Sequence, residues 1–213
     1  MNAIASQIHK VDPSNVALLR ILHLGSPALP VGAYAYSQGL EYAIDSGALT
    51  TMDDIRDWVS DALVCGLGAF ELPLLCRLIA AFARDDDQAV RYWNEEYLAG
   101  LDTSESVLES RQMAYSLLEL AKAVEWSCFA RVAELPGDGP IAFLTVYAAV
   151  VEEAKLGVAE ALTTFAWSWV ENQITAAVKA IPAGQMAGQR ALLAVVAEIP
   201  ETVERAMGLD DAG

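Results

Sequence analysis

Three apolar segments in the last third of the chain limit its fold more than any other feature. They span Ile141 to Lys155, Gly157 to Ile181 and Pro182 to Ala197. As helices, they would carry apolar surface wider than the stripe of a helix with one solvated face. They therefore lie at the centre of a helical bundle or against a partner. The 54% apolar composition, without Asn-Gly or Asp-Gly turns between alternating apolar residues, also favours helices over a sheet.

Helix start and stop signals divide the rest of the chain. Thr51 with Asp54 three residues later predicts a capping box, and the run from Pro136 to Pro140 predicts a loop within one domain. We predict an all-α, single-domain bundle of about ten helices over residues 14–208, after a flexible arm over residues 1–13. The other expected helices span residues 14–24, 34–47, 51–67, 73–84, 85–101 and 103–124, with a short acidic helix to residue 207.

The composition also restricts the partners and the compartment. A net charge of -16, from 29 acidic and 13 basic residues, opposes binding to nucleic acid. The longest uncharged run, Ile21 to Leu40, is interrupted by prolines and glycines, and no signal peptide precedes it, so no membrane partner is expected. Cys65, Cys76 and Cys128 are predicted to be small core residues in a reduced compartment. We expect a cytoplasmic protein.

Residues suited to catalysis or metal binding are sparse. The two histidines, His9 and His23, form no metal-binding spacing, and His23 is predicted to be a hydrogen-bonded core or interface residue. Phosphate-binding loops and serine nucleophile motifs are absent. The run Asp85 to Asp87 is weakly similar to the magnesium motif of prenyl-diphosphate enzymes, although a helix N-terminal acidic cluster explains it better. We expect no enzyme, catalytic residue, cofactor or bound metal.

The segment from Gly25 to Ala43 has an unusual sequence for a linker. Pro27 and Pro30 fix an extended approach to a helix, and Gly32 permits a backbone turn closed to other residues. In the helix that follows, one face is expected to be buried and its neighbour exposed. The buried face carries Tyr36, Leu40 and Ile44, and the neighbouring face carries Ser37, Glu41 and Asp45. Glu41 is either a solvated carboxylate or a contact for another protein.

A second unusual segment runs from Val178 to Arg190. Pro182 is expected to end one helix and start another. Lys179 then lies at a helix C-terminus, which favours its charge. Gln185 and Gln189 lie one helical turn apart, so they either bridge two helices or subunits or form an ordinary polar face.

The first segment, SPALPVGAYAYSQGLEYA, resembles the N-terminal signature of the UreF family of urease accessory proteins. VKAIPAGQMAGQR resembles the later motif of that family, and short patterns at residues 71–74 and 111–113 extend the similarity. The resemblance implies a non-enzymatic, all-α homodimer that binds UreD (also called UreH) and the GTPase UreG. It further implies that the protein supports GTP-dependent nickel insertion into apo-urease and modulates GTP hydrolysis by UreG.

The resemblance also assigns residues by their positions in the motifs. The implied partner contacts are Tyr36, Ser37, Gln38, Glu41, Lys179, Gln185 and Gln189. The structural positions of the two motifs are Pro27, Pro30, Gly32, Gly39, Pro182 and Gly184. Residues 209–213 stand where the family continues into a tail that helps to bind UreD, so we expect this tail to be absent.

Two alternatives to an adaptor remain open. One is an α-helical, Mg²⁺-dependent enzyme acting on a diphosphate through Asp85 to Asp87. The other is a generic helical interaction protein unrelated to nickel. The wide apolar faces over residues 141–197 predict a dimer in any of these cases.

Overall fold

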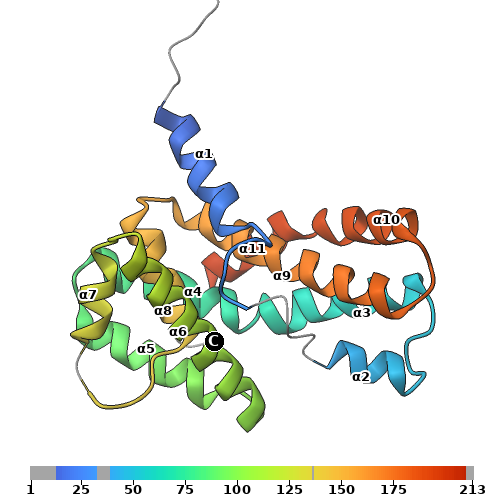
Figure 1. The fold of residues 1–213 in the computed structure, drawn as a ribbon, viewed down its shortest axis with the longest axis horizontal. Coiled ribbons are helices and arrows are strands. Elements are labelled where there is room, and N and C mark those ends of the chain that lie inside the picture. The colour runs from blue at the N-terminus through green and yellow to red at the C-terminus, as the bar shows by residue number, and fades with distance from the viewer. Residues whose placement is uncertain (1–12, 33–38, 136, 210–213) are drawn as a thin grey trace, which may run out of the picture.

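A computed structural model describes residues 13–32, 39–135 and 137–209, which form helices without any strand (Figure 1). The prediction of an all-α bundle of about ten helices is confirmed. A π-helical segment, Ala62–Leu67, directly continues α3. The α-helices are α1 Pro13–Leu24, α2 Leu40–Asp45, α3 Met52–Asp61, α4 Glu71–Ala83, α5 Asp87–Ala99, α6 Ser104–Ala123, α7 Cys128–Ala133, α8 Phe143–Glu153, α9 Val158–Ala180, α10 Gln185–Val196 and α11 Ile199–Gly208.

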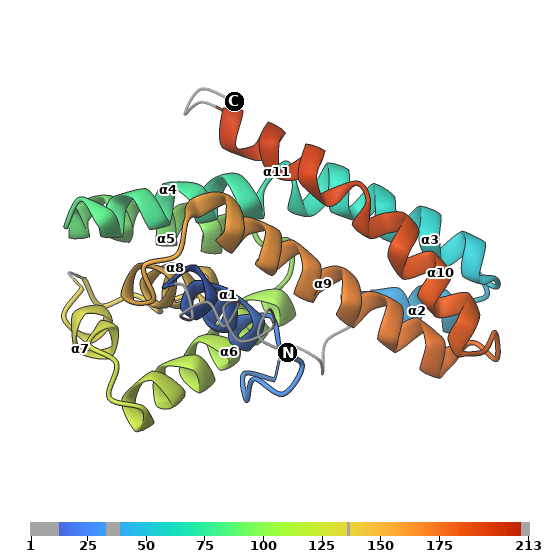
Figure 2. The ribbon, with the colours of Figure 1, turned by 90° about the horizontal axis from the view of Figure 1, so that it is seen from above.

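Helices α8 and α9 occupy the centre of the fold, as the apolar segments predicted. Every residue from Phe143 to Val151 is buried, because α8 packs against α4, α5, α6 and α7. Helix α9 crosses the molecule and contacts α1, α2, α3, α4, α10 and α11 (Figure 2). Much of the wide apolar surface that predicted a dimer is therefore covered within one chain, and the homodimer stays a prediction.

Exposed apolar side chains gather instead on peripheral helices. Helix α1 projects from the body of the protein (Figure 1) and exposes Val16, Leu18, Leu19 and Leu22. On the same helix His23 is exposed and makes an edge contact with Trp126, with ring centroids 6.2 Å apart. The core alternative for His23 is wrong, because only part of α1 packs against α9, and the interface alternative stays a prediction.

The capping box at the start of α3 is confirmed. The hydroxyl of Thr51 accepts a hydrogen bond from the Asp54 amide at 3.1 Å, and the Asp54 carboxylate accepts one from the Thr51 amide at 2.8 Å. Hydrogen bonds from the Thr50 and Thr51 amides also hold the pKa of Asp54 below its usual value. These bonds satisfy amide groups that a helix N-terminus otherwise leaves unpaired.

Two helix starts differ from the prediction because glycine breaks the helical backbone there. Helix α2 begins at Leu40, directly after Gly39, whose φ is 89°. Helix α10 begins at Gln185 and not at Pro182, because Gly184 has a φ of 80°. These left-handed values favour glycine. The short helix α7 was not predicted.

The cysteines are less uniformly buried than predicted. Cys128 is buried, Cys76 is half-buried and Cys65 is exposed on the π-helical segment, so the core prediction is wrong for Cys65. Burial raises the pKa of the Cys128 thiol to about 11.

Within the described ranges no single helix is long and apolar enough to cross a membrane. One pair, Met52–Leu67 with Glu71–Ala83, meets the criteria of length and composition together, with a bend of 42°.

Candidate functional site

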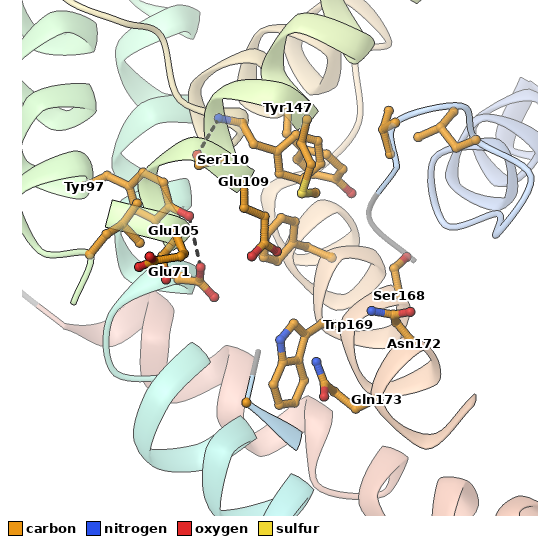
Figure 3. A pocket seen from close by; sticks show the side chains of 18 of the residues that line it. Glu71, Tyr97, Glu105, Glu109, Ser110, Tyr147, Ser168, Trp169, Asn172 and Gln173 are labelled. Atoms are coloured by element: carbon orange, nitrogen blue, oxygen red, sulfur yellow. Dashed lines mark hydrogen bonds between the residues drawn. The ribbon is translucent and has the colours of Figure 1, made fainter. Parts of the chain in front are cut away.

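A cavity of about 680 Å³ opens between the N-terminal segment, α6 and α9 (Figure 3). We call it the acidic pocket, because four carboxylic acids are among its lining residues. Its volume lies within the range of small-molecule sites. It is lined by Leu24, Ser26, Leu29, Val31, Gly39, Glu71, Tyr97, Leu101, Asp102, Thr103, Glu105, Ser106, Glu109, Ser110, Met113, Phe143, Tyr147, Phe165, Ser168, Trp169, Asn172 and Gln173.

Three of the carboxylic acids, Glu71, Glu105 and Glu109, lie on the same side of the acidic pocket (Figure 3). Glu71 on α4 accepts a hydrogen bond from the Tyr97 hydroxyl at 3.1 Å, and Figure 3 shows Glu105 beside this pair. Burial raises the pKa of Glu71 to about 7. Burial, and then the negative charge of Glu71, raises the pKa of Glu109 to about 7. None of the described lining residues is Lys, Arg or His, so no lining cation offsets these charges.

The rest of the pocket wall is largely apolar and aromatic. The rings of Tyr147 and Phe165 meet edge to face at a centroid distance of 5.1 Å, and Phe143 lies 6.2 Å from Phe165. Gln173 on α9 is fully buried, and neither its amide nitrogen nor its amide oxygen has a hydrogen-bond partner. The pocket therefore combines an acidic side, an aromatic wall and an unsatisfied amide.

The first motif segment forms part of this wall. Pro27 and Pro30 are exposed, whereas Leu29 and Val31 between and after them are buried and line the pocket. The Leu29 amide donates a hydrogen bond to the Ser26 carbonyl at 2.9 Å, which closes a turn. Gly32 follows with a φ of 75°, as its predicted turn role requires.

The second motif segment lies elsewhere, at the end of the molecule where α9 meets α10. Lys179, Gln185 and Gln189 line a cleft of about 100 Å³ there, and all three are exposed. Glu41 is exposed on α2, which packs against α9 at this same end (Figure 2). We call these four residues the motif surface. The other predicted contacts, Tyr36, Ser37 and Gln38, lie outside the described residues.

The aspartates at the start of α5 have structural partners. Arg131 pairs with Asp85 at 3.0 Å and with Asp87 at 3.1 Å, and the Asp86 carboxylate accepts a hydrogen bond from the Ala89 amide. These contacts support the helix N-terminal interpretation over a magnesium motif. Across the described ranges, no three His, Cys, Asp or Glu side chains are grouped to hold a metal ion.

Sequence reasoning missed the acidic pocket. One signal was present: Glu105 and Glu109 are four residues apart in a helix whose start was predicted, so they share one face. Ser106 and Ser110 are also four residues apart and lie on the neighbouring face of the same helix. Local spacing does not indicate that Glu71 and the aromatic residues of α8 and α9 meet that face, because they come from distant parts of the chain.

The two raised pKa values predict how stability depends on pH. Folded Glu71 and Glu109 keep their protons up to about pH 7, whereas the usual pKa is 4.5, so the folded state binds more protons between these values. Their contribution to stability is therefore complete below about pH 4.5, decreases as pH rises towards 7 and is lost above 7. The double substitution Glu71→Gln and Glu109→Gln should remove this loss.

We expect the double variant to gain stability over the wild-type protein by about 1 to 3 kcal/mol between pH 5 and pH 8. Urea denaturation at several pH values measures the difference. Glu119→Gln, an exposed change on the same helix α6, is the matched control and should show no such trend. A stability difference that stays constant with pH would contradict the prediction.

The fold is all-helical, and its two motif segments are the ones that resemble the UreF family of urease accessory proteins. A sequence model of UreF matches residues 49–196. The Urease accessory protein UreF of Methylobacillus flagellatus is 44% identical over 195 residues, covering 92% of this chain and 86% of that protein. The protein of the same name in Azoarcus sp. is 44% identical over 203 residues, covering 92% of this chain and 84% of that protein. The one in Nitrosococcus oceani is 40% identical over 195 residues, covering 92% of this chain and 87% of that protein. The chain belongs to the UreF family.

Proposed function

We propose that this protein is a non-enzymatic, cytoplasmic adaptor in urease maturation. It links UreD and the GTPase UreG, acts as a homodimer and supports GTP-dependent nickel insertion into apo-urease, while modulating GTP hydrolysis by UreG. The observation that carries the proposal is membership of the UreF family, whose relatives match over 92% of the chain and bear the name Urease accessory protein.

The motif surface supports an adaptor role. It presents an anionic, a cationic and two amide side chains, all exposed, at one end of the molecule. Exposed charged and amide groups on ordered helices can give a partner orientation and specificity without a catalytic group. The motif surface is the part of the chain that we assign to contact with UreG.

The test is reconstitution of the complex from this protein, UreD and UreG, followed by nickel-dependent activation of apo-urease. We expect Lys179→Glu to weaken capture of UreG by about tenfold or more, because it places a repulsive charge in the contact. Glu41→Lys is expected to act in the same direction. Binding is measured by titration of UreG onto the immobilised complex.

Lys155→Glu is the matched control, because Lys155 is also exposed but lies before the opposite end of α9. It should leave capture of UreG unchanged. Normal nickel loading of urease without this protein would overturn the proposed function. Equal loss of capture with Lys155→Glu would overturn the assignment of the motif surface.

A further inference from the structure

We propose that the acidic pocket binds a small organic cation, with an ammonium or amidinium group near Glu71, Glu105 and Glu109 and an apolar body against the aromatic wall. This ligand site is separate from the motif surface and goes beyond the adaptor function. It rests on the charge, the lining and an unsatisfied polar group of the pocket.

The negative charge of the pocket favours a positively charged ligand. Glu71 and Glu109 are half-buried, and Glu71 is close enough for its charge to raise the pKa of Glu109. Glu105 and Asp102 add two exposed carboxylates to the lining. The described lining provides no basic side chain to neutralise them. Burying carboxylates together without a counter-ion is unfavourable, and a bound cation would relieve that penalty.

The lining also selects an organic ligand over a metal ion. The aromatic residues Phe143, Phe165 and Trp169 also line the pocket and can cover an apolar or aromatic body. Aromatic faces also attract organic cations directly. The described lining contains no His or Cys, the ligands that bind transition metals most tightly.

Gln173 gives a second, independent sign of a ligand. Its side chain is fully buried, lines the pocket and extends from α9 towards Trp169 (Figure 3). Both polar atoms of the amide lack partners. Buried amides in folded proteins nearly always have a hydrogen-bond partner, so a group bound in the pocket would complete the hydrogen bonding of Gln173.

The experiment uses the full chain and two probes, benzamidinium and n-butylammonium, titrated by calorimetry at pH 8, where Glu71 and Glu109 are ionised. Benzamide, the uncharged counterpart, and benzoate, the anionic one, are matched controls. We expect saturable binding of at least one cation and binding of benzamide weaker by about tenfold or more, because charge-assisted hydrogen bonds are lost.

Variants locate the site. Glu109→Gln and Glu71→Gln should each weaken binding by about tenfold, and Gln173→Leu should weaken it less, whereas Glu119→Gln on the outer face of α6 should bind as the wild-type protein does.

Lowering the pH from 8 to 5 should also weaken binding, because the pocket carboxylates gain protons and lose their charge. The titratable groups that line the site are Glu71, Tyr97, Asp102, Glu105, Glu109 and Tyr147.

Four results would overturn the proposal. The first is that the folded protein binds neither cation saturably at about 10 mM, and the second is that benzamide binds as tightly as the cations. The third is that the Glu71 and Glu109 variants bind the cations as the wild-type protein does. The fourth is that equimolar Ni²⁺ displaces a bound probe. The last result would identify the pocket as a metal site. None of these results depends on urease activation, so the ligand proposal and the proposed adaptor function are tested independently of each other.

Discussion

Asn94→Ala is expected to destabilise the protein by about 3 to 5 kcal/mol, because it removes the partner of two buried polar groups, the Ala142 amide and the Thr145 hydroxyl, and of the partly buried Pro140 carbonyl. Asn94 on α5 is fully buried. Its side-chain nitrogen donates to the Pro140 carbonyl at 2.9 Å. Its side-chain oxygen accepts from the Ala142 amide at 2.9 Å and from the Thr145 hydroxyl at 2.8 Å. One amide therefore fixes the end of the 137–140 loop and the start of α8.

Equilibrium unfolding in urea, monitored by circular dichroism, measures this loss. Gln88→Ala is the matched control, because Gln88 is an exposed amide on the same helix and its removal should change stability by less than about 0.5 kcal/mol. A loss below about 1 kcal/mol for Asn94→Ala would show that the three groups find other partners and would contradict the prediction.

Phe82→Ala is expected to cost about 3 to 5 kcal/mol, the range for removal of a buried aromatic side chain. Phe82 on α4 is 1% exposed, and the guanidinium carbon of Arg131 lies 4.9 Å from its ring centroid. The substitution would leave a cavity in the core. It would also remove the ring beneath Arg131, which bonds to the Phe82 carbonyl at 2.9 Å and pairs with Asp85 and Asp87.

The control for this change is Tyr92→Ala on α5, because Tyr92 is 52% exposed. We expect that variant to lose only about 1 kcal/mol, because about half of the Tyr92 surface remains in water after folding. Phe82→Leu should retain most of the stability, because it keeps most of the buried volume. Thermal and urea unfolding of the three variants would test this order, and equal losses for Phe82→Ala and Tyr92→Ala would refute it.

The motif surface was partly predictable from local spacing. Gln185 and Gln189 are one helical turn apart, so their common face follows from helix geometry alone. Their approach to Lys179 depends on the turn at Gly184, which brings α10 back along α9. The sequence pattern placed Pro182, and not Gln185, at the start of α10, because a proline is favourable at that position but does not require a helix there.

By itself, the sequence determined most of the helices and the central position of the first two apolar segments, whereas the third forms the peripheral helix α10, in which Met186 and Leu193 are exposed. The cap at Thr51 and the loop near Pro140 are signals carried by neighbouring residues, because helix capping and turn formation act over a few positions. The burial of α8 followed from its composition, since no face of that helix is polar enough to remain in water.

Only the tertiary structure decided which distant residues meet. The start of α8 has no side-chain cap of its own and is held by Asn94 from α5 and Ser110 from α6. The acidic pocket likewise joins Glu71, Glu109 and Gln173 from three helices. Such contacts depend on how helices pack, which is set by many apolar contacts along the whole chain, so spacing within one segment cannot reveal them.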